Sequence, residues 1–289
     1  EVYDRATKKK LIHVDADELS FDLYDNPQKA YITKIPYEEQ SAILYKDFNF
    51  DGVKDFAIID GFRNWTLGHS FKIFLASSKR FVFSDSFTEL TQDNQGMFTV
   101  NAINKTISTK SKIGDTWYQY SDYIVENNKP KLIRRHTDDY EHAPFYRETI
   151  EELKGNKMVK TTRSSLALER YHIEECFKFH VDKVNKDIIL CNFYDDRLYY
   201  VILDAKQNVE FYYPFEELRQ TSDFIFYRKN GKLTFKNKDA SYTIYDKSGK
   251  IGVDITYKGK IHQWKGNTKS RRGSIGKLLK GSLNNVVYQ

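Results

Sequence analysis

Short segments in which apolar and polar residues alternate recur along this chain, and they restrict its fold more than any other feature. Clear examples are residues 71–75, 117–125 and 176–181. Alternation with a period of two places successive side chains on opposite faces of a β-strand. The apolar residues agree with this, because Tyr (21) and Phe (20) dominate while Met (2) is scarce, and aromatic residues favour pleated, half-buried strands. The sequence therefore predicts a mainly β protein with antiparallel sheets, in a sandwich or propeller-like arrangement.

Polar and glycine-containing turns divide these segments into hairpins and the chain into two domains. The predicted hairpins pair residues 71–75 with 80–83, 117–125 with 131–135, and 146–153 with 158–162. The short, polar and basic stretch 161–165 marks a boundary, so we expect a first domain at 1–163 and a second β-rich domain at 164–289. Helical periodicity is weak, and only brief helical turns are expected, at 215–219 and 273–280.

Composition and charge exclude several classes of protein. Aromatic residues make up 15% of the chain, which is more core material than disordered chains carry. No stretch approaches the roughly 18–20 apolar residues of a transmembrane helix, so no transmembrane segment is expected. The net charge of +6 is spread over 289 residues and does not indicate a nucleic-acid partner. The stretch after Asp254 is basic, and it fits a solvated surface or contact with an anionic partner.

The two cysteines, Cys176 and Cys191, are fifteen positions apart on neighbouring predicted strands. A hairpin would bring them within reach, and a disulfide closing such a loop would stabilise the fold by about 3 kcal/mol in the chain-entropy model. Two buried free thiols in a reducing compartment are the alternative. The chain begins at Glu1 without an initiator Met, so we expect that a signal peptide has been removed.

One motif carries defined chemistry, the D-x-N-x-D-G-x-x-D sequence that begins at Asp47. Oxygen-bearing side chains occupy its alternate positions, Asp47, Asn49 and Asp51, and a glycine follows. Calcium takes roughly six to eight oxygen ligands, which a short loop supplies by aiming several groups inward. The backbone carbonyl of Val53 and the carboxylate of Asp55 would complete the set. The sequence predicts a Ca²⁺ site with these five ligands.

The flanking sequence distinguishes this motif from an EF-hand. Ile58 stands where the EF-hand loop carries its closing Glu, and the neighbouring runs 42–45 and 56–59 are apolar and strand-like. We therefore expect a calcium loop between two β-strands, with calcium holding the fold. A metal-free turn rich in Asp, Asn and Gly is the alternative.

Signals for catalysis are absent from the sequence. Seven histidines are scattered, without an H-E-x-x-H motif or a close Cys–His zinc spacing. There is no nucleophile elbow, P-loop or dinucleotide fingerprint. Asp138, Asp139, Glu141 and His142 are grouped, but we interpret them as a solvated polar loop. The sequence therefore favours a protein that is not an enzyme.

The segments that follow the calcium motif have an ordered pattern. They are residues 56–60, 71–75, 79–83, 87–90, 104–109 and 117–120. Together with the motif, this order resembles a family of periplasmic calcium-binding immunity proteins, which neutralise peptidoglycan hydrolases delivered by bacterial type IV or similar secretion systems. The resemblance covers about residues 30–135 and does not extend into the second domain.

The resemblance implies a non-catalytic periplasmic protein, soluble or lipid-anchored, that binds and neutralises a secreted toxin. The toxin would be a peptidoglycan hydrolase, and members of the family can block the cleft of a lysozyme-like enzyme with a loop. Here the segment 62–70, with Trp65 and His69, would present such a loop, or it is an ordinary hairpin connection.

Three other functions stay open. One is a calcium-dependent carbohydrate- or surface-binding module, in which Trp65, Trp117 and Trp264 stack on sugars. Another is an immunity protein against a non-muralytic effector such as a lipase. The third is an enzyme whose site is assembled from acids and histidines that are scattered in the sequence.

Overall fold

The protein is mainly β, with antiparallel sheets and few short helices, as the sequence predicted. The computed structural model describes residues 2–3, 6–15, 32–35, 38–41, 43–77, 80–142, 144–168, 176–193, 196–215 and 222–289. Two compact units make up the chain, one from residues 1–141 and 148–162, the other from 142–147 and 163–289. No helix in the described ranges is long and apolar enough to cross a membrane.

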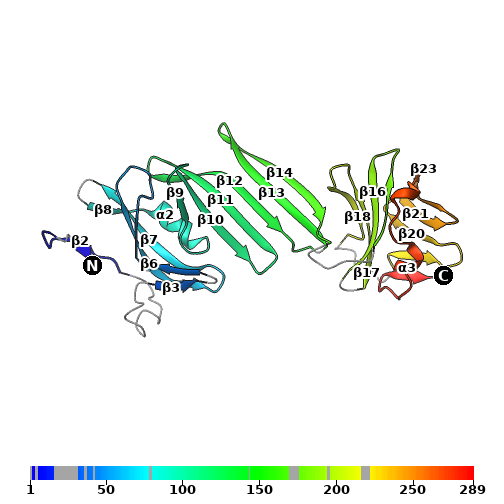
Figure 1. Cartoon of the computed structure of the whole chain (residues 1–289), viewed down its shortest axis with the longest axis horizontal. Helices are drawn as coiled ribbons and strands as arrows, with labels where there is room; N and C mark the ends of the chain where they lie inside the picture. The colour runs from blue at the N-terminus through cyan, green and yellow to red at the C-terminus, as the bar shows by residue number, and fades with distance from the viewer. Residues whose placement is uncertain are drawn as a thin grey trace. The chain divides into compact units, whose positions relative to one another are not determined.

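The first unit contains two antiparallel meanders and two small hairpins (Figure 1). The four-stranded sheet has the order β5 (Ile43–Lys46), β6 (Asp55–Asn64), β7 (Gly68–Ser77), β8 (Arg80–Phe83). The six-stranded sheet consists of β9 (Thr99–Asn101), β10 (Thr106–Ile113), β11 (Trp117–Glu126), β12 (Lys129–Asp139), β13 (Phe145–Lys154) and β14 (Lys157–Leu166). Most of β13 and of β14 belongs to the first unit. The hairpins are β1 (Val2–Tyr3) with β2 (Lys10–Ile12), and β3 (Ile32–Ile35) with β4 (Glu38–Ser41).

A helix that the sequence pattern did not predict, α2 (Asp85–Gln92), lies against β7. The strand β8 pairs only with the C-terminal part of β7, which leaves the earlier amides of that edge without a strand partner. The amides of Phe71 and Ile73 instead donate to the hydroxyl oxygens of Thr91 (2.8 Å) and Thr88 (3.0 Å) on the helix. Covering an open sheet edge in this way satisfies its backbone groups and blocks pairing with another chain.

The core of the first unit lies between the four-stranded sheet, α2 and the beginning of the six-stranded sheet. Its buried side chains are Phe48, Ala57, Ile59, Phe71, Ile73, Leu75, Phe87, Leu90, Phe98 and Ile107. Phe48 belongs to the predicted calcium loop and is fully buried, with its ring edge-on to Phe98 at 5.4 Å between centroids. The loop is therefore anchored in the core by one of its own side chains.

The second unit is a sandwich of two sheets. The smaller sheet has the order β15 (Cys176–Val181), β16 (Lys186–Phe193), β17 (Arg197–Leu203), β18 (Val209–Tyr213). The larger sheet has the order β23 (Lys260–Lys265), β22 (Lys250–Tyr257), β21 (Ala240–Lys247), β20 (Lys232–Asn237), β19 (Phe224–Tyr227), β24 (Val286–Tyr288), and its pair β19–β24 is parallel. One buried cluster contains side chains of both sheets, such as Phe179, Tyr200, Phe235 and Val253, so the sheets pack face to face.

Two short helical elements follow the last long strand of this unit. They are η3 (Thr268–Ser270) and α3 (Ile275–Leu278). The short helix expected within 273–280 is thus confirmed. The helical turn expected at 215–219 falls almost entirely outside the described residues.

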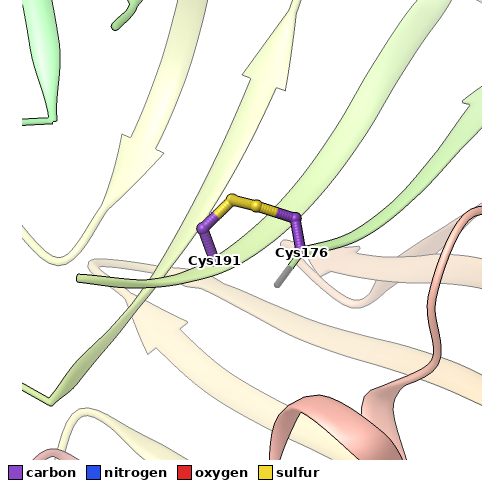
Figure 2. The surroundings of a disulfide bond; sticks show 2 residues. All are labelled: Cys176 and Cys191. Carbon is purple, nitrogen blue, oxygen red and sulfur yellow. A yellow bond between two sulfur atoms is a disulfide. The ribbon is translucent and has the colours of Figure 1, made fainter. Parts of the chain in front are cut away.

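Cys176 and Cys191 form a disulfide bond between β15 and β16 (Figure 2). The two residues are directly opposite each other in the antiparallel register, and their Cα atoms are 4.5 Å apart. Cys191 is fully buried. Of the two alternatives that the sequence left open, the structure has the bridge.

Candidate functional site

The D-x-N-x-D-G motif forms a tight loop between β5 and β6 that is closed by its own side chains. The carboxylate of Asp47 accepts hydrogen bonds from the amides of Asp51 (3.2 Å) and Gly52 (2.9 Å). Asp51 in turn accepts a hydrogen bond from the amide of Val53 (2.8 Å). Gly52 has a φ of +90°, a conformation that a residue with a Cβ adopts only with strain, so the sixth position of the loop requires glycine.

Asp55, the first residue of β6, joins this loop to the four-stranded sheet. It is fully buried, and its Oδ2 accepts from the amides of Phe48 (2.7 Å) and Asn49 (3.3 Å). Its Oδ1 accepts from the amide of Ala76 at the end of β7 (2.8 Å). Burial raises the pKa of Asp55 above its ordinary value, the three amides oppose that effect, and the charge of Asp51 raises the pKa further.

The five predicted calcium ligands therefore lie in the loop and at the first residue of β6. Their side-chain oxygens accept from amides of the loop and, for Asp55, also from the amide of Ala76. Asn49 also connects the loop to the turn between β11 and β12, because its Nδ2 donates to Asn128 Oδ1 (3.0 Å) and to Asp51 Oδ2 (2.9 Å). The carboxylates of Asp47, Asp51 and Asp55 do not bring three oxygens within 4.8 Å of one another. Binding calcium would require these side chains to turn inward.

The turn between β6 and β7 places Trp65 at the surface. The Trp65 side chain is 83% exposed. Asn64 Oδ1 accepts from the amides of Thr66 (2.9 Å) and Leu67 (2.8 Å). The carbonyl oxygens of the same two residues accept hydrogen bonds from segment 95–96, at 2.7 and 2.9 Å. The exposed indole thus directly precedes two residues whose amides and carbonyl oxygens are hydrogen-bonded.

His69, the other residue predicted to contact a partner, is 3% exposed. Its ring contacts Phe62 at 5.3 Å between centroids, and Phe62 contacts Trp65 at the same distance. His69 therefore supports the aromatic group from inside the unit, and Trp65 alone of this pair reaches solvent.

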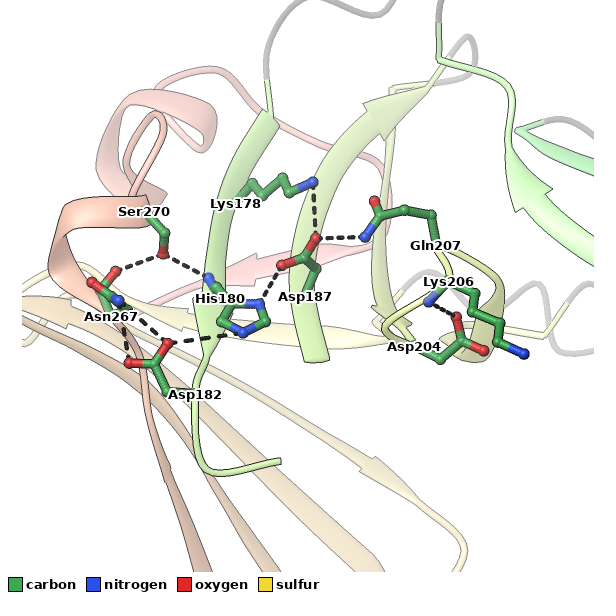
Figure 3. A network of polar contacts seen from close by, with 9 residues as sticks. All are labelled: Lys178, His180, Asp182, Asp187, Asp204, Lys206, Gln207, Asn267 and Ser270. Atoms are coloured by element: carbon green, nitrogen blue, oxygen red, sulfur yellow. Dashed lines mark hydrogen bonds and ion pairs between the residues drawn. The ribbon is translucent and has the colours of Figure 1, made fainter. Parts of the chain in front are cut away.

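In the second unit, a polar network that the sequence did not reveal surrounds Asp187 on β16 (Figure 3). His180 Nδ1 lies 2.8 Å from Asp187 Oδ1, while Lys178 Nζ (3.1 Å) and Gln207 Nε2 (2.9 Å) contact Oδ2. Burial raises the pKa of Asp187, but the hydrogen bonds from Gln207, His180 and Lys178 outweigh it and hold the pKa below its ordinary value. The network keeps this carboxylate charged.

Among the described residues, no hydroxyl or thiol group is hydrogen-bonded to the side chains of this Asp–His pair. Ser270 carries the hydroxyl drawn in Figure 3, and its Oγ accepts from the backbone amide of His180 (2.8 Å) and donates to the carbonyl of Asn267 (2.7 Å). Asn267 also donates to Asp182 at 3.2 Å. These contacts attach the segment around η3 to β15, which is a structural role.

The basic C-terminal stretch is largely exposed. The exposed cations are Lys258, Lys260, Lys265, Lys269, Arg271, Arg272, Lys277 and Lys280. Arg271 forms an ion pair with the buried Asp246 (3.0 Å), whose carboxylate also accepts from the amide of Ile275 (3.1 Å). Part of this charge therefore supports the fold.

Comparisons with known proteins give few and weak similarities. No family model matches the chain, and no curated protein matches it. A type IV secretion system related protein of Xanthomonas is 26% identical, covers 42% of this chain and 57% of its own, and has a TM-score of 0.38. An uncharacterized protein of Listeria monocytogenes EGD-e is 11% identical, with 56% of this chain and 61% of that protein covered and a TM-score of 0.17. TolB of Acinetobacter baumannii is 7% identical, with 80% of this chain and 57% of TolB covered and a TM-score of 0.19. This chain spans less than two thirds of each of these structures, and at such TM-scores none of them carries an argument about its function.

Proposed function

We propose that this protein is a non-catalytic periplasmic inhibitor that binds and neutralises a secreted antibacterial toxin, a peptidoglycan hydrolase. The order of segments after the calcium motif supports this proposal, since they resemble immunity proteins of that kind. The observation that carries it is the β6–β7 hairpin, which lies within the resembling region and presents Trp65. We assign the contact with the toxin to this hairpin.

The geometry of the hairpin suits an inhibitor. Binding hot spots are enriched in Trp, and a residue already held in its bound conformation loses little conformational entropy on association. Hydrogen bonds with the Asn64 side chain and with segment 95–96 hold the backbone of Thr66 and Leu67, directly after Trp65. An exposed indole on a hydrogen-bonded turn suits insertion into the cleft of an enzyme.

The same hairpin is less suited to a carbohydrate-binding module. Such a module would stack sugars on exposed indoles, here those of Trp65, Trp117 and Trp264. Of the chain's three tryptophans, Trp65 is exposed, whereas Trp117 and Trp264 are partly buried. A single exposed indole favours a protein anchor.

Replacing Trp65 by Ala is expected to weaken inhibition about 30-fold, which corresponds to a hot-spot loss of about 2 kcal/mol. Hydrolysis of peptidoglycan by a lysozyme, and by any peptidoglycan hydrolase encoded beside this gene, is measured against the concentration of this protein. Ile103→Ala is the matched control, because Ile103 is a 94% exposed apolar residue on another turn of the first unit, also closed by an Asn side chain. Equal inhibition by wild type and Trp65→Ala, or no inhibition by wild type, would contradict the proposal.

We also propose that the Asp47–Asp55 loop binds calcium. The donor set fits, since three carboxylates, the Asn49 amide oxygen and a backbone carbonyl are all hard oxygen ligands. The charges of Asp51 and Asp55 oppose each other in the absence of a cation. The role of calcium is to neutralise this repulsion and hold the loop, which is anchored in the core through Phe48.

Asp51→Ala is expected to abolish the stabilisation that calcium gives to the wild type. That stabilisation is about 2.7 kcal/mol when calcium is present at about 100 times its dissociation constant. Thermal melts with calcium chloride and with EGTA measure it. Asp115→Ala is the control, because Asp115 is a highly exposed Asp on the turn between β10 and β11. A calcium-dependent melt that Asp51→Ala leaves unchanged would refute the site.

A further inference from the structure

A second group of potential metal ligands lies on the six-stranded sheet, away from the calcium motif. His136 and Asp138 are two positions apart on β12, so their side chains lie on the same face of the strand. Glu148 comes from the neighbouring strand β13. His136 Nε2 is 3.1 Å from Asp138 Oδ1 and 3.2 Å from Glu148 Oε1, and all three ligand atoms lie within 4.8 Å of one another.

Residues 138–142 were interpreted from the sequence as a solvated polar loop. The structure instead places Asp138 and Asp139 at the end of β12. The side chains of His136, Asp138 and Glu148 are only 24, 20 and 26% exposed. The three groups are therefore partly shielded from water.

The surroundings of the His136 imidazole indicate that it binds a cation. Its Nε2 is inaccessible to solvent and makes no hydrogen bond, because neither carboxylate contact has hydrogen-bond geometry. Tyr120 lies opposite His136 in the register of β11 and β12, and the two rings are 6.2 Å apart. The ring of Tyr120 thus flanks the imidazole, and a buried nitrogen without a hydrogen bond faces two carboxylate oxygens.

We propose that His136, Asp138 and Glu148 bind a divalent first-row transition cation such as Zn²⁺. Imidazole and carboxylate are ordinary ligands of such metals, whereas calcium prefers oxygen ligands alone. A divalent ion would balance the two carboxylates and occupy the space in front of His136 Nε2. Three protein ligands leave room for water on the metal.

Bound metal would link β12 to β13. Both strands belong to the six-stranded sheet, and the three proposed metal ligands on them lie in the first unit. The metal would therefore stabilise this part of the sheet independently of the calcium loop. The inference does not depend on the proposed function, and its test measures binding without any toxin.

The test is a titration of the untagged full chain with Co²⁺ and Zn²⁺ in excess calcium chloride, which keeps the loop occupied. Visible absorption of Co²⁺ reports the ligand geometry, and calorimetry gives the affinity for Zn²⁺. We expect one equivalent to bind with a Co²⁺ spectrum that includes a nitrogen ligand. His136→Ala should weaken binding by more than about 100-fold, the upper end of what loss of an outer-shell partner costs.

Two controls separate this site from other binding and from misfolding. Glu152 lies on the same strand as Glu148, but its side chain contacts Arg134 and Lys154 and not His136. The variant Glu152→Gln should therefore bind metal as the wild type does. Glu148→Gln keeps the size of the side chain and should lose affinity while the melt without metal is retained. The proposal would be overturned in favour of a metal-free ionic contact if the wild type bound no metal. It would also be overturned if His136→Ala and Glu148→Gln bound metal as tightly as the wild type does.

Discussion

Asp55→Ala is expected to destabilise the first unit by about 3 kcal/mol, even when no calcium is present. The Asp55 carboxylate is fully buried and accepts hydrogen bonds from the amides of Phe48, Asn49 and Ala76. Alanine removes the acceptor of all three amides, and water reaches them only if the loop separates from the sheet. The loss is therefore structural, in addition to any loss of calcium binding.

Urea unfolding in EGTA measures this effect. A Trp264→Phe background restricts tryptophan fluorescence to the first unit, because Trp65 and Trp117 both lie there. Asp51→Ala is the control in the same motif, and because Asp51 is exposed we expect a change within about 0.5 kcal/mol in EGTA. If both variants unfold at the same urea concentration in EGTA, the structural role assigned to Asp55 is wrong.

Asp223→Ala is expected to destabilise the second unit by about 3–5 kcal/mol, the usual result of removing one partner of a buried ion pair. The Asp223 side chain is 1% exposed and lies 2.8 Å from Arg197 Nη2. It also accepts from Asn285 Nδ2 (3.1 Å), and Asn285 pairs with the backbone amide (2.8 Å) and carbonyl (3.0 Å) of Leu198. The carboxylate therefore supports the contact between β17 and the segment before β24.

The loss of stability expected for Asp223→Ala has an electrostatic cause as well as a packing cause. Burial raises the pKa of Asp223, although Asn285 and Arg197 oppose the shift. Asp223→Asn, which keeps the shape without the charge, should therefore cost less than Asp223→Ala. Unfolding is followed by Trp264 fluorescence in a background without the other tryptophans, with the exposed Asp239→Ala as control. A loss for Asp223→Ala no larger than that of Asp239→Ala would contradict the prediction.

The strands were largely predictable, because their pattern is local. The hairpin expected at 117–125 and 131–135 is the pair β11 and β12, and the one expected at 71–75 and 80–83 is the pair β7 and β8. Helix α2 was not predicted. With eight residues it is too short to show a clear helical period, and Thr88 and Thr91, which join it to β7, resemble strand residues in sequence.

The candidate sites also differ in how far the sequence could reveal them. The ligands of the calcium loop are close in sequence, so a motif was enough to find them. Trp65 and His69 are only four residues apart in sequence, but Trp65 is exposed and His69 is buried. Only the structure shows this difference. Glu148 comes from a different strand from His136, and neither spacing nor composition indicated that they meet.

The sequence by itself determined the β class, the positions of most turns and the oxygen-rich loop, because alternation, glycine and Asx chemistry act over a few neighbouring residues. Tertiary structure alone decided which polar groups from distant parts of the chain lie together. The group at His136, the network at Asp187 and the pair of Asp223 with Arg197 each join different strands or segments. Register and packing set those distances, and both depend on contacts between residues far apart in the chain.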